Sequence, residues 1–241
     1  MKLSIRALLL AALIPLTVAA CSGEPSQRRA FGEFLQTRIV DVSGTRVPEL
    51  TPAEKKAFGV YARDYAIITD FHSGMNERVT EPNNVLIKKT VIRSIGDILA
   101  QRDEIASAKD QMAGLRQALD EEQAKADAAH AKLKQPEDLK PRYDQAYEKL
   151  VTVPANAYRD VFPTIDGVFG SSLKIADYVK AHQDKIEISG TVVRVADPVV
   201  QKALGLLLKD LTAESEKAAE AQRKMQEVVQ GSPPAADSAP L

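Results

Sequence analysis

Hydrophobic residues along most of the chain recur at the three- and four-residue spacing of one helix face. The first stripe predicts a helix over 27–42. A capping box, in which Thr51 precedes Pro52 and Glu54, predicts the start of the next helix. The apolar positions of that helix have the spacing of a seam packed against a partner helix. They are Phe58, Tyr61, Tyr65, Ile68, His72, Met75 and Val79.

A proline-free stretch over 85–134 follows the run Glu81-Pro82-Asn83-Asn84, which we expect to break the chain. Every seventh residue in this stretch is apolar, which predicts one long coiled-coil-like helix. These residues are Ile98, Ile105, Met112, Leu119, Ala126 and Leu133. The complementary seam positions are mostly polar, and they are Arg102, Lys109, Arg116, Gln123 and His130. So narrow an apolar stripe indicates packing against one neighbour.

The last third of the chain predicts short helices, a hairpin and a final helix. Pro154 and Pro163 should punctuate short helices that extend to about 181. Two β-rich runs predict a hairpin at 185–195, which we expect to lie on a helix or to pair across a dimer. Asp197-Pro198 begins a final helix, which should pair antiparallel with part of the long helix. The fold class is therefore mainly α: an elongated helical bundle with a long coiled-coil-like helix and one small β-hairpin.

The N-terminus has the parts of an export signal. Lys2 and Arg6 precede an apolar run over 7–17, which is shorter than the roughly twenty residues that span a bilayer. Small residues then precede Cys21, and the run resembles the bacterial lipobox, which implies cleavage before Cys21 and a diacylglyceryl thioether on it. An ordinary secretory signal is the alternative. Against it, Cys21 is the only cysteine, and no His or second Cys surrounds it.

These features predict the domain organisation and the location. We expect a lipoprotein signal peptide at 1–20, lipidated Cys21 with a short tether at 21–26, a single helical domain at 27–230 and a disordered tail at 231–241. Several acyl chains, palmitate among them, would give stable attachment. Ser22 replaces the Asp that retains enterobacterial lipoproteins in the inner membrane. The resemblance therefore implies the outer membrane, facing the periplasm, with the periplasmic face of the inner membrane as the alternative. The tether would hold Arg28 and Arg29 near the headgroups.

Composition excludes several classes of function. A net charge of −1 gives no basic excess for nucleic acid. The absence of Trp and the scarcity of other aromatic residues disfavour carbohydrate-stacking platforms. One cysteine allows no intramolecular disulfide, so packing alone must stabilise the fold.

Candidate chemistry is sparse. Ser171 and Lys174 form a Ser-x-x-Lys string, but the companion motifs of penicillin-recognising enzymes do not occur. The histidines, His72, His130 and His182, lack metal-binding spacing, and we expect His72 to be a hydrogen-bonded core or boundary residue. The acidic clusters should be solvated helix faces with i,i+4 partners, including Glu121–Lys125 and Glu220–Lys224. We therefore expect no enzymatic activity, no cofactor and no metal.

Several longer stretches resemble a known family. They are Gln27 to Phe31 with Phe34-Leu35-Gln36, Lys55 to Gly59 with Asp64 to Ile67, and Ala126 to His130 with Leu133-Lys134-Gln135, Asp138 to Pro141 and Asp144-Gln145-Ala146. On these residues the chain resembles the YiaF-like lipoproteins, a family known as a domain of unknown function. The resemblance is good over 27–155 and thins after about 180. It implies no site residues.

Two functional hypotheses remain open. The first is a membrane-anchored, non-enzymatic module of the cell envelope that binds or scaffolds another protein. The second is a module that binds a lipid or other amphiphile between the N-terminal helices and the 155–181 segment. An envelope hydrolase using Ser171 is a distant third.

Overall fold

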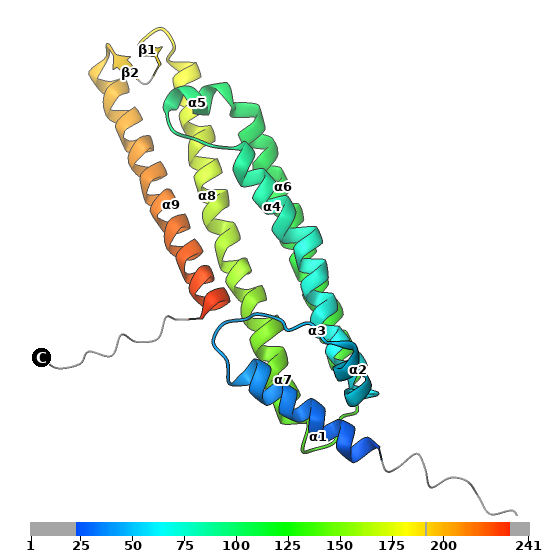
Figure 1. Cartoon of the computed structure of the whole chain (residues 1–241). Coiled ribbons are helices and arrows are strands. Elements are labelled where there is room, and N and C mark those ends of the chain that lie inside the picture. Colours follow the sequence, from blue (N-terminus) through cyan, green and yellow to red (C-terminus); the bar gives the residue numbers. More distant parts are fainter. Residues whose placement is uncertain (1–22, 191, 232–241) are drawn as a thin grey trace, which may run out of the picture.

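The protein is a long helical bundle with a small hairpin at one end and its first helices at the other (Figure 1). A computed structural model describes residues 23–190 and 192–231. The mainly α fold class with one hairpin is therefore confirmed. Of the predicted disordered tail at 231–241, only Gly231 lies within the described residues.

The first helix, α1 (Glu24–Leu35), continues into a π-helical turn, η1 (Gln36–Val40). It begins earlier than the predicted start at 27, and the last residues of the predicted tether at 21–26 are therefore helical. Two residues explain the early start. Pro25 lies in the first turn, where its missing N–H leaves no intrahelical bond unmade, and the negative charge of Glu24 is favourable at a helix N-terminus.

The predicted capping box is present at the start of α2 (Pro52–Phe58). The backbone N–H of Thr51 donates to Oε2 of Glu54 over 2.8 Å, and that of Glu54 donates to Oγ1 of Thr51 over 3.2 Å. Gly59, with φ of 54°, ends the helix, and α3 (Tyr61–Met75) follows. The predicted seam is thus divided between two helices, although its apolar members share one core.

The predicted breaks at Pro82 and Pro154 are wrong, because a π-helical turn precedes each proline. The turn η2 (Asn76–Thr80) leads into α4 (Glu81–Lys89). The turn η3 (Glu148–Thr152) joins α7 (Lys140–Tyr147) to α8 (Val153–Ala181). A π turn bonds each N–H to the carbonyl five residues back, as from Glu81 to Asn76. This wider turn relieves the clash between the proline ring and the preceding turn of the helix.

The longest continuous helical segment therefore runs over 140–181, not over the predicted 85–134. Pro163 lies inside α8 and does not end it either. The chain breaks after α4 and resumes as α5 (Ile95–Ala100) and α6 (Arg102–His130). Ser94 explains the new start, since its Oγ accepts a hydrogen bond from the backbone N–H of Asp97 over 3.1 Å.

The predicted apolar row of α6 is confirmed, but the predicted second row of seam positions is wrong by one residue. Ile105, Met112, Leu119 and Ala126 are buried as predicted. The second buried row consists of Ala108, Leu115 and Glu122, one position before the predicted row. Four of the polar residues in the predicted row instead pair with the antiparallel 140–181 segment. The pairs are Arg102–Asp177, Lys109–Asp166, Gln123–Arg159 and His130–Asp144.

The predicted hairpin is present, and it lies on helices. Its strands, β1 (Ile186–Ser189) and β2 (Val192–Val195), pair antiparallel, with Gly190 in the turn at φ of 61°. Ile186 is buried in a small second core with residues of α5, α8 and α9 (Pro198–Gln230). Asp197 caps α9, as predicted. However, α9 runs antiparallel to α8 rather than to the 85–134 stretch (Figure 1).

Candidate functional site

The predicted lipidation site, Cys21, lies outside the described residues. The structure nevertheless fixes where the chain enters the fold, because α1 begins at Glu24 and only Ser22 and Gly23 separate it from Cys21. The beginning of α1 lies at one end of the bundle, where α1 packs on α2 and α7 (Figure 1). We call this the N-terminal end, and the hairpin lies at the opposite end.

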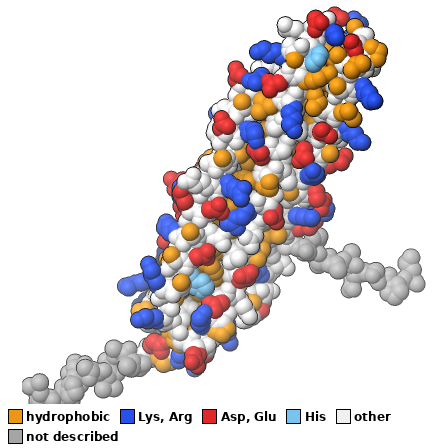
Figure 2. Space-filling model, turned by 180° about the vertical axis from the view of Figure 1, so that it is seen from behind, with side chains coloured by type: hydrophobic (Ala, Val, Ile, Leu, Met, Phe, Trp, Pro, Cys, Tyr) orange, Lys and Arg blue, Asp and Glu red, His pale blue; other side chains and the backbone are white. Residues whose placement is uncertain are grey.

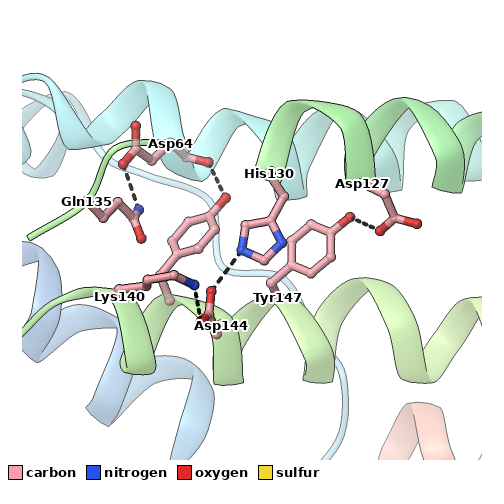
Figure 3. A network of polar contacts seen from close by, with 8 residues as sticks. Asp64, Asp127, His130, Gln135, Lys140, Asp144 and Tyr147 are labelled. Carbon is pink, nitrogen blue, oxygen red and sulfur yellow. Dashed lines mark hydrogen bonds and ion pairs between the residues drawn. The ribbon is translucent and has the colours of Figure 1, made fainter. Parts of the chain in front are cut away.

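A network of polar side chains lies at the N-terminal end, where α6 turns back into α7 (Figure 3). Asp144 is its centre. Its Oδ1 lies 2.9 Å from Nε2 of His130, and its Oδ2 accepts a hydrogen bond from Lys140 over 2.5 Å. The imidazole of His130 stacks on the ring of Tyr147, with centroids 4.1 Å apart. These contacts fix the angle between α6 and α7.

Further hydrogen bonds extend the network to α3 and to the loop after α6 (Figure 3). The hydroxyl of Tyr147 donates to Oδ1 of Asp127 over 2.7 Å. The hydroxyl of Tyr143 donates to the backbone oxygen of Asp64 over 2.6 Å, and Nε2 of Gln135 donates to Oδ2 of Asp64 over 2.7 Å. The network thus joins three helices and the loop at one corner of the bundle.

Burial and hydrogen bonding set the protonation states in this network. Burial raises the pKa of Asp64, and the hydrogen bond from Gln135 opposes that rise. Burial acts in the same direction on Asp144, but hydrogen bonds from Lys140 and His130 outweigh it and lower the pKa of that carboxyl. Burial raises the pKa of the Tyr143 and Tyr147 phenols far above the usual range. Near neutral pH the phenols are therefore donors and Asp144 is an acceptor.

The chemistry of these groups favours a structural role. They are carboxylates, an imidazole, an amine, an amide and phenols, so the network can exchange protons but contains no activated hydroxyl or thiol nucleophile. Each phenol and the imidazole is occupied by a partner within the protein. Sequence inspection placed His130 on a polar stripe but did not find the network. Most of its residues nevertheless fall in the stretches by which the chain resembles the YiaF-like family.

The other two histidines also lie against backbone oxygens. Nε2 of His72 lies 2.5 Å from the backbone oxygen of Leu150, and burial lowers the pKa of this histidine against the opposing effect of that hydrogen bond. This confirms the prediction of a hydrogen-bonded core or boundary residue. His182 lies at the C-terminal end of α8, with Nδ1 2.9 Å from the backbone oxygen of Tyr178.

The Ser-x-x-Lys string lies within α8. Ser171 is 8% exposed, whereas Lys174 projects into solvent from the helix surface. The arrangement therefore buries the candidate nucleophile and solvates the candidate base.

The prediction of solvated acidic clusters is wrong for Glu122. Its side chain is buried between α6 and α3, and Oε1 accepts a hydrogen bond from Arg78 over 2.6 Å. Arg78 also binds Glu121 over 2.5 Å, and Lys125 lies nearer to Glu122, at 3.8 Å, than to its predicted partner Glu121. The packing surface explains the difference, because Gly74 of α3 leaves room for the carboxylate. The predicted Glu220–Lys224 pair is present at 3.5 Å.

The apolar interior predicted to accept an amphiphile is filled by side chains. Phe31, Phe162 and Phe169 are buried in the main core between the N-terminal helices and α8. Several surface grooves lie elsewhere, and two of them bear on ligand binding. One of about 660 Å³ runs between α4 and α6, beside Glu77, Glu81, Asp103 and Glu104. The other, of about 520 Å³, lies at the hairpin end between α5, α8, β2 and α9.

Within the described ranges, no helix combines the length and the apolar content needed to cross a bilayer. Among the same residues, no group of three or more His, Cys, Asp or Glu side chains is arranged to hold a metal ion.

Comparison with known proteins gives a family. Residues 7–226 match a family model described as "Protein of unknown function (DUF3053)". The "Uncharacterized protein YiaF" of Escherichia coli strain K12 is 32% identical over 197 residues, which cover 81% of this chain and 82% of that protein. The protein of the same name from Shigella flexneri has the same identity and coverage. No solved structure matches the chain. The chain therefore belongs to the YiaF-like family of proteins of unknown function.

Proposed function

We propose that this protein is a lipoprotein of the bacterial cell envelope, anchored by lipid on Cys21, which acts without catalysis by binding another envelope protein. The lipobox-like run before Cys21 and the start of α1 at Glu24 support the anchor. The outer membrane, facing the periplasm, is the proposed location, with the periplasmic face of the inner membrane as the alternative.

Exposed apolar side chains at the hairpin end are the observation that carries the proposed interaction. Val199 and Leu206 of α9 are 78% and 57% exposed, and Val192 of β2 is 53% exposed. We call Val199 and Leu206, which both lie on α9, the distal apolar surface. Figure 2 shows hydrophobic side chains gathered over this end of the molecule. Apolar side chains that gather on a surface mark interaction sites in soluble domains.

The packing of α9 explains why this surface is available. Val200 and Leu204 are buried against α8 and the hairpin, on the inward face of α9. Val199 and Leu206 are seven residues apart, so they share a different face. A helix of a partner protein can therefore lie along α9 and cover both side chains in the manner of a two-helix seam.

Photo-crosslinking in intact cells tests the interaction. A photoreactive residue at Leu206 should give a discrete adduct with another protein, and Val199→Lys should abolish that adduct. The matched control is the same photoreactive residue at Arg116, an exposed position on α6. Equal adducts from both positions, no adduct from Leu206, or an adduct of two copies of this chain would each contradict the proposal.

The groove at the hairpin end supports a second candidate function, the binding of a lipid or other amphiphile. Its volume of about 520 Å³ falls within the range of small-molecule sites. The apolar residues lining it are Ile92, Ile95, Ile98, Val168, Val193, Leu208 and Leu211.

Mass spectrometry of the purified protein separates the two candidates. If the groove binds an amphiphile, a lipid besides the anchor co-purifies with the wild type and is lost in Val168→Trp, whose indole would fill the groove. If no lipid co-purifies, the second candidate fails, whereas the crosslinking prediction stands unchanged.

A further inference from the structure

We propose that the N-terminal end binds the surface of an anionic phospholipid bilayer through a cluster of cations, so that the bundle holds its hairpin end away from the membrane. This inference rests on the proposed lipid anchor and adds the lipid chemistry that the folded body recognises. The cations, which we call the basic end, are Arg29, Lys55, Lys56, Arg63, Lys132 and Lys134.

Contacts between distant segments bring these residues to one end of the bundle. The side chain of Gln27 in α1 lies against Gly59, so the turn between α2 and α3 abuts the first turns of α1. Gln135 binds Asp64, which places the loop after α6 beside the start of α3. Arg28 reaches Asp138 of the same loop over 3.1 Å. The three segments that carry the basic end are therefore neighbours.

Several acids near the basic end already have partners. Glu24 accepts from the hydroxyl of Tyr61 and pairs with Arg28, and Asp138 also pairs with Arg28. Lys140 and His130 engage Asp144. The six cations of the basic end themselves make no ion pair among the described residues. Glu33, Asp64 and Glu137 also lie nearby and have no cationic partner among the described residues, so they reduce the local positive charge, but the six cations of the basic end outnumber them.

An exposed apolar residue lies within this charged surface. Val60, in the turn between α2 and α3, is 58% exposed, and Lys56 and Arg63 flank it in the chain. An apolar side chain bordered by cations matches the bilayer interface, where the apolar group enters the headgroup boundary and the cations meet lipid phosphates.

The short distance to Cys21 favours this contact in the anchored protein. Three residues span at most about 11 Å, so Glu24 cannot lie farther than that from the lipidated residue. That reach is close to the screening length of about 8 Å at physiological ionic strength. The beginning of α1 therefore lies within about two screening lengths of the lipidated residue, which brings the N-terminal end of the bundle close to the headgroups.

Vesicle sedimentation tests the proposal without using the anchor. The probe is the mature chain, which starts at Cys21 and has its thiol alkylated. This chain keeps the whole described core, because the first buried hydrophobic residue of that core is Phe31. It should sediment with vesicles of phosphatidylcholine mixed with phosphatidylglycerol and should dissociate from them in high salt. It should not bind vesicles of phosphatidylcholine alone. Since each basic residue near an anionic surface contributes about fivefold, Lys55→Gln with Lys56→Gln should weaken partitioning about 25-fold.

A second pair of exposed lysines gives the matched control. Lys202→Gln with Lys209→Gln removes the same charge from α9 at the hairpin end and should leave partitioning unchanged. Equal losses in both double variants would overturn the proposal, because net charge alone would then explain binding. Failure to sediment with anionic vesicles would also overturn it. Neither result bears on lipidation, which mass spectrometry of Cys21 measures separately. Circular dichroism of each variant verifies that the helices are retained.

Discussion

The carboxylate of Glu122 on α6 occupies the space in which a side chain on Gly74 of α3 would lie. Arg78 fixes the carboxylate there through Oε1, and the other oxygen, Oε2, is buried without a hydrogen-bond partner among the described residues. The close approach of α3 and α6 therefore depends on the absence of a side chain at position 74. It also depends on the ion pair between Arg78 and Glu122, a glutamate that the sequence analysis placed on a solvated helix face.

Gly74→Ala should destabilise the protein, although alanine is the better helix former. The added methyl group would displace Glu122 from Arg78, and a lost charged hydrogen bond outweighs the gain in helix propensity of about 1 kcal/mol. We expect the free energy of unfolding in urea to fall by about 1–2 kcal/mol. Gly114→Ala is the control, because nothing lies within 4 Å of its added Cβ. It should stabilise α6 by about 0.5–1 kcal/mol.

A double variant separates this contact from other effects. In a Glu122→Ala background, Gly74→Ala should no longer destabilise, because the carboxylate that it displaces is absent. If Gly74→Ala instead stabilises the wild-type protein as Gly114→Ala does, the close contact between Gly74 and Glu122 is wrong.

Pro163→Ala should stabilise the protein. Pro163 is exposed inside α8, where it removes one backbone hydrogen bond and contributes little packing. We expect a gain of about 1–3 kcal/mol in the free energy of unfolding, measured in urea. Pro52→Ala is the control, since Pro52 lies in the first turn of α2 and should give no gain. A Pro163→Ala variant no more stable than wild type would show that α8 is interrupted at this position.

Acidification should destabilise the protein through His72. Burial lowers the pKa of His72 in the folded protein below the value of 6.5 expected in the unfolded chain. Below that value the unfolded state binds a proton that the folded state excludes, so this contribution to stability is complete above about pH 6.5 and is lost as pH falls. Unfolding free energies measured from about pH 8 to about pH 5 should therefore decline.

His72→Gln keeps an amide donor for the backbone oxygen of Leu150 but does not titrate in this range. Its free energy of unfolding should decline less steeply with acid than that of the wild type. Identical pH profiles for the two proteins would rule out His72 as the titrating group.

The sequence predicted features that depend on neighbouring residues. The Thr51–Glu54 capping box and the hairpin at Gly190 are local, and both are present. The breaks predicted at Pro82 and Pro154 were wrong because the effect of each proline depends on the turn before it. No residue signature predicts the π turns at 76–80 and 148–152. Heptad spacing identified one buried row of α6 but misplaced the other, since alanine and a paired glutamate do not mark a core position.

The polar network could not be predicted because its members come from distant parts of the chain. Asp64 and Gln135 meet only when α3 packs beside the loop after α6. The basic end has the same origin, since its residues belong to α1, α2, α3 and that loop. Charge balance read along the sequence, with a net charge of −1, conceals a local excess that tertiary contacts create.

Mass spectrometry of the N-terminal peptide of the protein purified from its native membrane tests the central claim most directly. We predict a peptide that begins at Cys21 and carries a diacylglyceryl thioether with further acylation. Substituting Cys21→Ser should leave an unlipidated protein that is not cut before residue 21. A wild-type N-terminus elsewhere, or an unmodified Cys21 on a protein recovered without membrane, would contradict the anchored arrangement.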